Sequence, residues 1–173
     1  MKLVTYVQEG TPRLGAVNDS QVIDLAQAWV AYRKRAGGSA SHEADFPIDM
    51  LALLKADQGT RSVVTSMVAW AEALPEADAA SFRRPLAQVK LAAPLSNPSK
   101  IICVGLNYHD HCREVDQKVP ERPILFAKFP SSIIGHEDEI TWPPDASQKV
   151  DYEVELAVII GREGRHISCL LYT

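Results

Sequence analysis

The sequence predicts an α+β protein in which a small N-terminal α/β domain, residues 1–75, precedes a β-rich domain. Short β-branched runs open the chain at residues 2–7 and 13–17, and amphipathic helical patterns follow them. Residues 76–98 are rich in alanine, proline and serine and predict a linker. From residue 99 to 173, short apolar runs alternate with proline-containing turns, which is typical of short strands and not of a doubly wound sheet.

The elements of the N-terminal domain follow from turn residues and periodicity. Glu9-Gly10-Thr11-Pro12 separates the first two runs and predicts a hairpin. The remaining predicted elements, in chain order, are a strand at 21–23, a helix at 25–35 ended by Gly37-Gly38, a loop at 39–45, a short helix from about 48 to Gly59, and an amphipathic helix at 63–74. None of these elements indicates chemistry, so the domain is expected to be a cap or spacer.

Composition limits the function classes. The chain has 173 residues, 46% of them hydrophobic, and a formal net charge of −4, which argues against a nucleic-acid or anionic-membrane partner. No apolar stretch approaches the ~20 residues of a membrane span, and the N-terminus lacks the apolar region of a signal peptide. Cys103, Cys112 and Cys169 have no CxxC spacing and indicate a reducing environment. The sequence therefore predicts a cytoplasmic protein.

The clearest chemical pattern lies in residues 150–161, where every even position from Val150 to Ile160 is apolar. A strand alternates its side chains, so Glu153 and Glu155 share one face, roughly 6.6 Å apart at ~3.3 Å per residue. Two carboxylates so close repel each other, and a hard divalent cation would offset the repulsion. The alternative is a solvated edge strand with no metal.

A second pattern is the polar segment 105–114. If a helix begins near Asn107, a suitable N-cap, His111 and Glu114 lie three residues apart on one face. A carboxylate beside an imidazole orients it and holds its proton, as in a general-base dyad. The alternatives are ordinary surface histidines, or His109 as the acting imidazole.

Two further side chains have competing interpretations. Lys128 is a lone cation within an apolar run, so it either meets an anionic substrate or extends to the surface. Cys112, beside a histidine, raises the weaker alternative of a cysteine hydrolase, although neighbours on a helix point in different directions.

In this order and spacing, these segments resemble the fumarylacetoacetate hydrolase family over about residues 99–168. The segments that carry the resemblance are Lys100-Ile101-Ile102-Cys103-Val104-Gly105-Leu106-Asn107-Tyr108, His111 with Glu114, Pro123-Ile124-Leu125-Phe126-Ala127-Lys128, Ser131-Ser132-Ile133-Ile134-Gly135 and residues 150–161. The G-x-N-Y-x-x-H-x-x-E element and the later E-x-E are more specific together than either alone. The first hundred residues are similar to the variable N-terminal domain of many members.

The resemblance implies a mixed β-sandwich or roll that binds Mg²⁺, or Mn²⁺ or Ca²⁺ in some members. Glu153 and Glu155 would be metal ligands, and His111 with Glu114 the catalytic dyad. The residues expected to bind substrate are Asn107, Tyr108 and Lys128. The expected activity is hydrolysis, decarboxylation or tautomerisation of a 2-keto or 1,3-diketo acid, of the fumarylacetoacetate, acylpyruvate or oxaloacetate type. Members are often homodimers.

The resemblance also implies a third metal ligand, an aspartate some thirty residues past the E-x-E. The segment 169–173 is unlike the family's continuation, so the sequence predicts a member truncated within its catalytic domain, with the third ligand missing. The alternative function is an inactive fragment or pseudoenzyme that acts only as a binding module.

Overall fold

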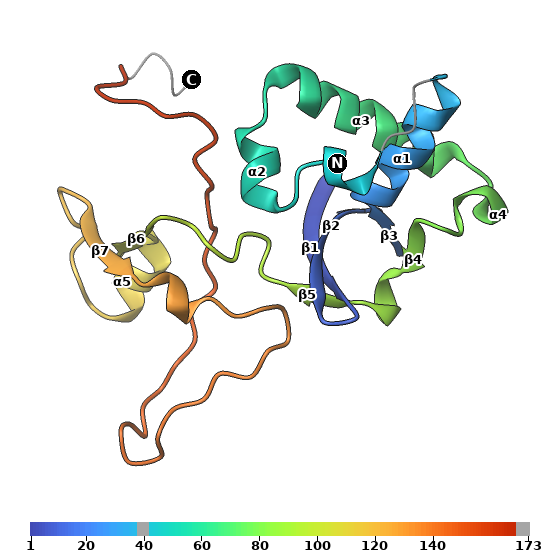
Figure 1. The fold of residues 1–173 in the computed structure, drawn as a ribbon. Coiled ribbons are helices and arrows are strands. Elements are labelled where there is room, and N and C mark those ends of the chain that lie inside the picture. The colour runs from blue at the N-terminus through green and yellow to red at the C-terminus, as the bar shows by residue number, and fades with distance from the viewer. Residues whose placement is uncertain (38–41, 169–173) are drawn as a thin grey trace. The chain divides into compact units, whose positions relative to one another are not determined.

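The computed structural model describes residues 1–37 and 42–168 (Figure 1). The chain divides into two compact units, Met1–Glu137 and Asp138–Thr173. The predicted loop at 39–45 lies partly outside the described residues, and its described end is a 3-10 turn, η1, at Glu43–Asp45.

The first unit contains a five-stranded antiparallel sheet in the order β4-β3-β2-β1-β5. Its strands are β1 (Lys2–Gln8), β2 (Thr11–Val17), β3 (Gln21–Asp24), β4 (Arg83–Pro85) and β5 (Lys90–Ala92). The predicted hairpin is confirmed, with Gln8 paired to Thr11 across a turn in which Glu9 and Gly10 have positive φ. Glycine accepts this backbone conformation without a steric penalty.

Aspartate caps each of the first three α-helices of this unit. These helices are α1 (Leu25–Arg35), α2 (Met50–Lys55) and α3 (Gln58–Ala73). Asp24, Asp49 and Asp57 each accept a hydrogen bond from the backbone N–H three residues later, which satisfies a donor that the first helical turn leaves open. The hydrogen bond from the Thr60 N–H lowers the pKa of Asp57 below its ordinary value. A short helix, α4 (Glu76–Ala79), and a 3-10 turn, η2 (Leu86–Gln88), complete the unit's N-terminal part.

The core lies between α1, α2, α3 and the sheet face that carries Leu14, Ala16 and Ile23 (Figure 1). Fourteen residues form one buried cluster there, and α3 contributes the four at three- and four-residue steps: Val64, Met67, Val68 and Ala71. The predicted helices at 25–35 and 63–74 are confirmed. Their apolar stripes were legible in the sequence because helical hydrogen bonds are local.

Asp24 also anchors a buried polar network. Its carboxylate accepts hydrogen bonds from the Tyr6 hydroxyl, the Arg13 guanidinium and the Gln27 N–H, and Arg13 reaches Glu43 at 2.7 Å. Burial alone would raise the pKa of Asp24, but the hydrogen bonds from Arg13, Tyr6 and Gln27 outweigh it and lower that pKa. Burial, and then the hydrogen bond to Asp24, raise the pKa of Tyr6 above its ordinary value.

Gly15 makes room beside this network. It pairs with Asp24 across β2 and β3, and a Cβ at this position would lie 2.6 Å from Cγ1 of Val22 and 3.2 Å from the Tyr6 ring. The missing side chain therefore lets Val22 and Tyr6 pack against the sheet on the network's face.

The structure differs from the predicted linker at residues 76–98. β4 pairs with β3 and β5 pairs with β1, so this stretch supplies both edges of the sheet. Alanine and proline are compatible with short edge strands, and composition alone did not reveal the pairing. The division into domains stays a prediction, with the N-terminal sheet extending to Ala92.

The rest of the first unit is a two-stranded antiparallel sheet, β6 (Ile101–Gly105) with β7 (Ile124–Lys128), and a short helix, α5 (His109–Glu114), between the strands. A 3-10 turn, η3 (Pro130–Ser132), follows. The register pairs Gly105 with Ile124 and Ile101 with Lys128. The predicted strand at 101–104 is confirmed.

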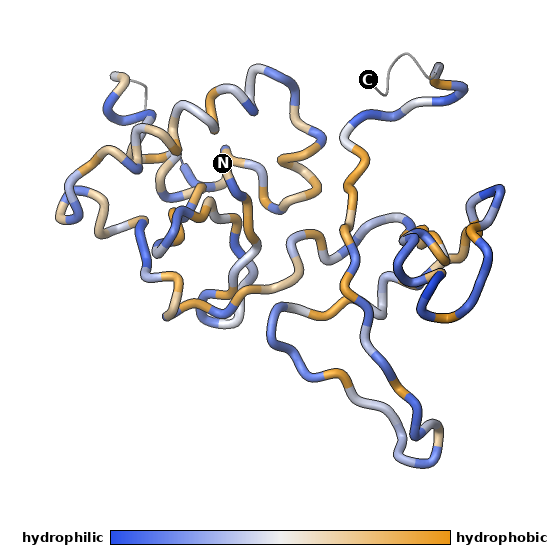
Figure 2. The backbone as a smooth tube through the Cα atoms, turned by 180° about the vertical axis from the view of Figure 1, so that it is seen from behind, coloured by the Kyte–Doolittle hydropathy of each residue, from blue (hydrophilic) through white to orange (hydrophobic). Residues whose placement is uncertain are grey.

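The second unit differs from the prediction. Residues 150–161 form no strand among the described residues, although their sequence alternates as a strand should. Figure 2 shows hydrophobic stretches along this part of the chain, and Val154 and Leu156 are both more than 80% exposed. A strand needs a backbone partner to hold its hydrogen bonds, and no described segment pairs with this one. The α+β class is nevertheless confirmed by the helices and antiparallel sheets of the first unit.

Candidate functional site

The candidate site is built around the turn between β6 and α5. β6 ends at Gly105, and Leu106 then adopts a positive φ of 50°, a conformation that side chains other than glycine rarely take. α5 starts at His109, with Tyr108 at the N-cap position but no side-chain capping bond. The predicted N-cap, Asn107, is therefore one residue too early. Strained backbone of this kind clusters at functional sites in proteins.

Cys112 ties α5 to this turn. It is the one buried residue of the helix, at 1% exposure, and its thiol donates a hydrogen bond to the Leu106 carbonyl at 3.5 Å. A six-residue helix has little stability of its own, so this anchor fixes where the helix lies relative to the turn. A buried, hydrogen-bonded thiol suits a structural role, which weakens the cysteine-hydrolase alternative.

The helix ends in a Schellman motif. The Gln117 N–H donates to the Cys112 carbonyl at 2.8 Å, and the Asp116 N–H donates to the Arg113 carbonyl at 3.3 Å. Asp116 occupies the left-handed position, with φ at 50°. Glycine is the usual residue there because it pays no steric penalty.

Replacing Asp116 by glycine is expected to stabilise α5 by about 0.5–1 kcal/mol, because the substitution removes the steric cost of the left-handed backbone. Hydrogen exchange of the Cys112 and Val115 amides should slow up to about fivefold. Asp110→Gly, within the helix, is the control and should speed exchange. Unchanged exchange in the Asp116 variant would contradict the capping role.

The structure brings His111 and Glu114 together on α5. The Nδ1 atom of His111 lies 3.7 Å from Oε2 of Glu114, which is ion-pair distance and longer than a direct hydrogen bond. Both side chains are accessible, at 42% and 79% exposure. Catalytic hydrogen bonds are often long before substrate binds and shorten in the complex. The pair can therefore orient an imidazole that accepts a proton from a bound acid.

A pocket of about 290 Å³, partly open to solvent, lies beside the same turn. Its lining includes the predicted substrate residue Asn107, together with His109, Glu121 and Arg122. Sequence reasoning named His109 only as an alternative imidazole and did not single out Arg122. The sequence feature that could have pointed to Arg122 is a cation next to a proline, in a polar loop that precedes a strand.

The other two predicted substrate residues do not line this pocket. Tyr108 is 47% exposed at the start of α5. Lys128 lies at the far end of β7, with its ammonium 5.9 Å from the centre of the Phe126 ring, within range of a cation–π contact. Their roles in substrate binding stay predictions.

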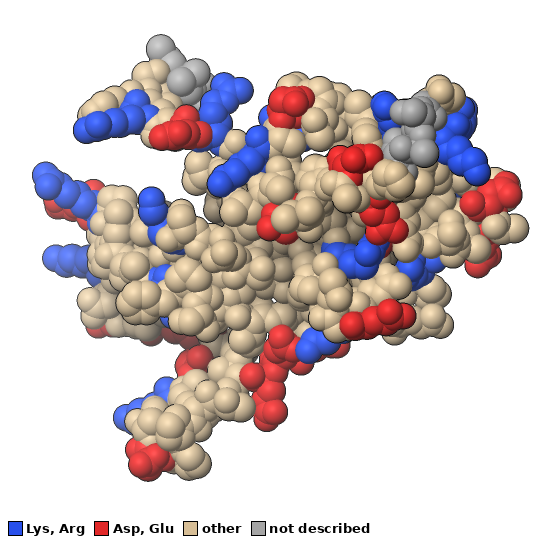
Figure 3. Space-filling view, viewed as in Figure 1, with Lys and Arg blue, Asp and Glu red and all other residues tan. Residues whose placement is uncertain are grey.

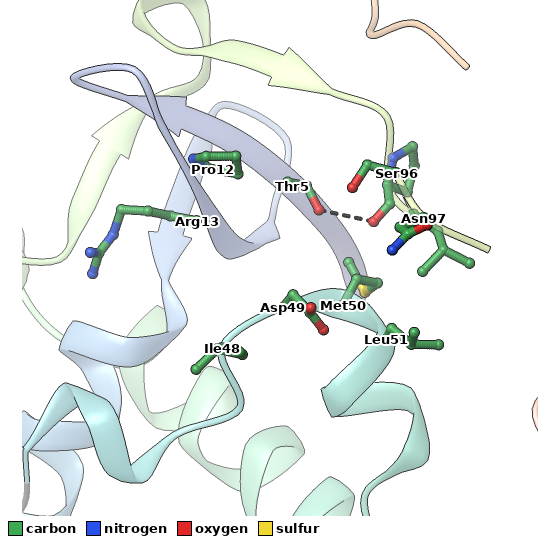
Figure 4. Close-up of a pocket in the computed structure, with 11 residues that line it drawn as sticks. Thr5, Pro12, Arg13, Ile48, Asp49, Met50, Leu51, Ser96 and Asn97 are labelled. Atoms are coloured by element: carbon green, nitrogen blue, oxygen red, sulfur yellow. Dashed lines mark hydrogen bonds between the residues drawn. The ribbon is translucent and has the colours of Figure 1, made fainter. Parts of the chain in front are cut away.

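A second pocket, of about 80 Å³, lies in the N-terminal part (Figure 4). Two of its polar side chains have partners within the chain: the Thr5 hydroxyl donates to the Pro94 carbonyl at 2.9 Å, and Asp49 caps α2. Figure 4 shows the guanidinium of Arg13 directed away from Ser96, and this group binds the buried network described above. The pocket is therefore a seam between the sheet and α2.

Glu153 and Glu155 are exposed and lie in the segment that forms no strand. Two carboxylates suit a hard divalent cation in chemistry. Within residues 1–37 and 42–168, however, no three histidine, cysteine, aspartate or glutamate side chains come close enough to hold a metal ion. The described residues therefore do not complete a metal site, and the assignment of these two glutamates as ligands stays a prediction.

The surface and the helices bear on the class of partner. Figure 3 shows acidic and basic side chains interspersed on the face that it presents, without a continuous basic surface. None of the described helices is long and apolar enough to cross a membrane.

Comparison with known proteins identifies the C-terminal part of the chain. The family model "Fumarylacetoacetate (FAA) hydrolase C-terminal" matches residues 100–170. Oxaloacetate tautomerase Fahd2a, mitochondrial, of Rattus norvegicus is 55% identical over 84 residues, which are 49% of this chain and 26% of that protein. The fumarylacetoacetate hydrolase domain-containing protein 2 homolog of Dictyostelium discoideum is 35% identical over 172 residues, which cover 97% of this chain and 48% of that protein.

A solved structure gives the same answer for the fold. The crystal structure of a protein from Mycobacterium smegmatis, provisionally named HpcE, superposes with a TM-score of 0.51 at 27% identity, covering 83% of this chain and 41% of the other. The chain thus spans about half, or less, of the proteins that it matches.

The prediction of a cytoplasmic location is wrong by these comparisons, because the rat relative and its human and bovine counterparts are mitochondrial proteins. The prediction rested on the cysteine spacing and on the lack of a long apolar stretch. These features do not separate the two compartments, since transit peptides are amphipathic and not continuously apolar.

The match over residues 100–170 contains the α5 turn, the His111–Glu114 pair and both glutamates of the later segment. The relative from Dictyostelium discoideum extends the similarity to nearly the whole chain. Residues 100–170 of the chain therefore match the fumarylacetoacetate hydrolase family.

Proposed function

We propose that this chain is part of an enzyme that moves a proton on a small 2-keto or 1,3-diketo acid, as a tautomerase or a hydrolase. The observation that carries the proposal is the His111–Glu114 pair on α5, at 3.7 Å, beside the pocket that Asn107 lines. The rat relative, named an oxaloacetate tautomerase, supports a keto acid as substrate. We favour tautomerisation because it requires proton transfer alone, whereas hydrolysis also requires a placed water molecule.

In this proposal the His111 imidazole accepts a proton from the carbon next to the keto group, which leaves an enolate, and then delivers that proton to the enolate oxygen to give the enol. The enol-to-keto direction runs through the same two transfers in reverse. The Glu114 carboxylate, three residues on, would fix the ring orientation and stabilise the imidazolium that forms. The open face of α5 leaves both groups accessible to a ligand, since neither side chain is buried. Dimer formation, which the family resemblance implies, stays a prediction.

The proposal is tested by following the enol-to-keto conversion of oxaloacetate, and the cleavage of an acylpyruvate, with the chain and with a longer member of the family alongside. A rate above the uncatalysed reaction for oxaloacetate supports tautomerisation. Cleavage of the acylpyruvate alone would replace it by hydrolysis. If the longer protein is active and the chain only binds substrate, the alternative of a non-catalytic binding module holds for the chain.

We also propose that Glu153 and Glu155 bind a divalent cation together with ligands outside the described residues. Mg²⁺ keeps several waters and favours sites with few protein carboxylates, so binding to the chain is expected to be weak. Glu153→Gln or Glu155→Gln should weaken that binding at least about tenfold, because changes even one shell further out cost about 10–100-fold. Calorimetric titration with MgCl₂ measures the effect.

Glu163→Gln is the matched control for this titration, since it removes one exposed carboxylate from the same unit. Its affinity for Mg²⁺ should equal that of the unchanged chain. An equal loss of Mg²⁺ affinity in all three variants would show that the affinity depends only on the net charge of the chain. If Glu153→Gln and Glu155→Gln both bind Mg²⁺ as the unchanged chain does, the two glutamates are solvated side chains and not metal ligands.

A further inference from the structure

The pocket beside the α5 turn contains a cation that the sequence patterns did not single out. Arg122 lines it, two residues before β7 begins, and makes no hydrogen bond or ion pair within the described part of the chain. His109, at the start of α5, also lines the pocket and is likewise without a polar partner there. Two nitrogen-bearing side chains without protein partners therefore share one concave surface with the Asn107 amide.

This set of groups has the chemistry of a carboxylate receptor. A guanidinium presents a planar fork of N–H donors that matches the two oxygens of a carboxylate. An imidazole and a carboxamide each add one N–H donor for the remaining lone pairs. The volume of about 290 Å³ lies at the lower limit of the usual range for small-molecule sites, ~300–1,000 Å³, and suits a small acid.

The cation predicted from the sequence does not line the same pocket. Lys128 is the last residue of β7, whereas the pocket adjoins the Gly105–Ile124 end of the hairpin. Six residues of extended chain separate Arg122 from Lys128, roughly 20 Å at ~3.3 Å per residue. Lys128 does not line the pocket, so it is not one of the groups that share this concave surface.

We propose that Arg122, with His109 and Asn107, binds a carboxylate of the substrate and so determines the specificity of the site for keto acids over neutral ketones. This inference rests on the proposed function for the identity of the ligand. Glu121 also lines the pocket and has the opposite effect, since its charge repels an anion. Removing the charge of Arg122 and removing the charge of Glu121 should therefore change the affinity for an anion in opposite directions.

The experiment measures binding of pyruvate, the simplest 2-keto acid, by amide chemical-shift titration, which needs no turnover. Arg122→Gln should weaken pyruvate binding about tenfold at low salt, the loss expected for a charge-assisted hydrogen bond. Glu121→Gln should strengthen it. Methyl pyruvate, the neutral ester, should bind weakly and equally to all variants, and 0.5 M NaCl should reduce the difference for pyruvate.

Lys118→Gln is the matched control, because it removes the same charge from the same loop but outside the pocket lining. It should bind pyruvate as the unchanged chain does. Lys128→Gln tests the rival cation, and it should weaken pyruvate binding less than Arg122→Gln does. Equal weakening by Arg122→Gln and Lys118→Gln would reduce the effect to net charge and overturn the proposal. Weakening by Lys128→Gln alone would transfer the role to that residue and would also overturn the proposal.

Failure of this inference and failure of the proposed function are distinguishable. If oxaloacetate is converted but pyruvate binding ignores Arg122, the carboxylate lies elsewhere and the specificity proposal fails. If no substrate is converted but pyruvate binding depends on Arg122, the subsite stands and the enzymatic proposal for the chain fails.

Discussion

His111→Ala is expected to lower kcat for keto–enol conversion by about 10²–10⁴-fold, the usual contribution of a positioned general base. Substrate affinity should change little, because the imidazole acts on the reacting carbon and does not line the pocket. Glu114→Gln should have a smaller effect, since the amide still contacts the ring but cannot stabilise the imidazolium. These effects are measured by steady-state kinetics on oxaloacetate, with the unchanged protein, the His111→Ala variant and the Glu114→Gln variant compared in a form of the protein that shows activity.

His136→Ala is the control for this series. His136 is an exposed histidine with a carboxylate neighbour, Glu137, at 3.8 Å, so it matches the chemistry of the proposed dyad without the α5 turn. Its variant should turn over as the unchanged protein does. A His111 variant with normal turnover would remove the dyad from the mechanism, and His109 would become the imidazole to test.

Asp24→Asn is expected to cost about 3–5 kcal/mol of unfolding free energy, because it leaves the buried Tyr6 hydroxyl and the partly buried Arg13 guanidinium without their carboxylate. Urea denaturation of the unchanged and variant chains measures the loss. Asp57→Asn is the matched control, since asparagine caps a helix about as well as aspartate and Asp57 is exposed. Equal stability of the two variants would show that Asp24 stabilises the chain only as the N-cap of α1.

The same network predicts how stability depends on pH. The pKa of Asp24 is lower in the folded chain than in the unfolded chain, so its contribution is present above the unfolded value of about 3.9 and is lost as pH falls below it. The pKa of Tyr6 is raised, so its contribution is present below about 10 and declines as pH rises beyond that. Thermal melting from pH 3 to 11 should therefore show two declining limbs, and Asp24→Asn should flatten the acid limb.

Features held by interactions between residues near one another in the sequence were predicted correctly. The helix predicted at 25–35 matches α1 residue for residue, because Asp24 caps it and its hydrogen bonds close within four residues. The His111–Glu114 pair was predicted for the same reason: three residues on a helix bring two side chains to one face. The N-cap was missed by one residue, which is within the usual uncertainty of helix ends.

Strands were predicted less well, since their partners come from elsewhere in the chain. The edge strands β4 and β5 lie in a stretch whose composition resembles a linker, and only pairing with β3 and β1 identifies them. The segment 150–161 shows the converse error. Its alternation is strand-like, yet no described segment supplies the hydrogen bonds that a strand requires.

The helices, the turn and the spacing of the proposed dyad could be read from the sequence, because each depends on residues within a few positions of one another. The family resemblance could be read in the same way, since the order of the motifs does not depend on strand pairing. The contacts of Arg13 and Tyr6 with Asp24, and the return of the loop carrying Arg122 to the α5 turn, are visible only in the folded chain. Contacts between residues distant in sequence depend on how the backbone packs, and no local pattern encodes that packing.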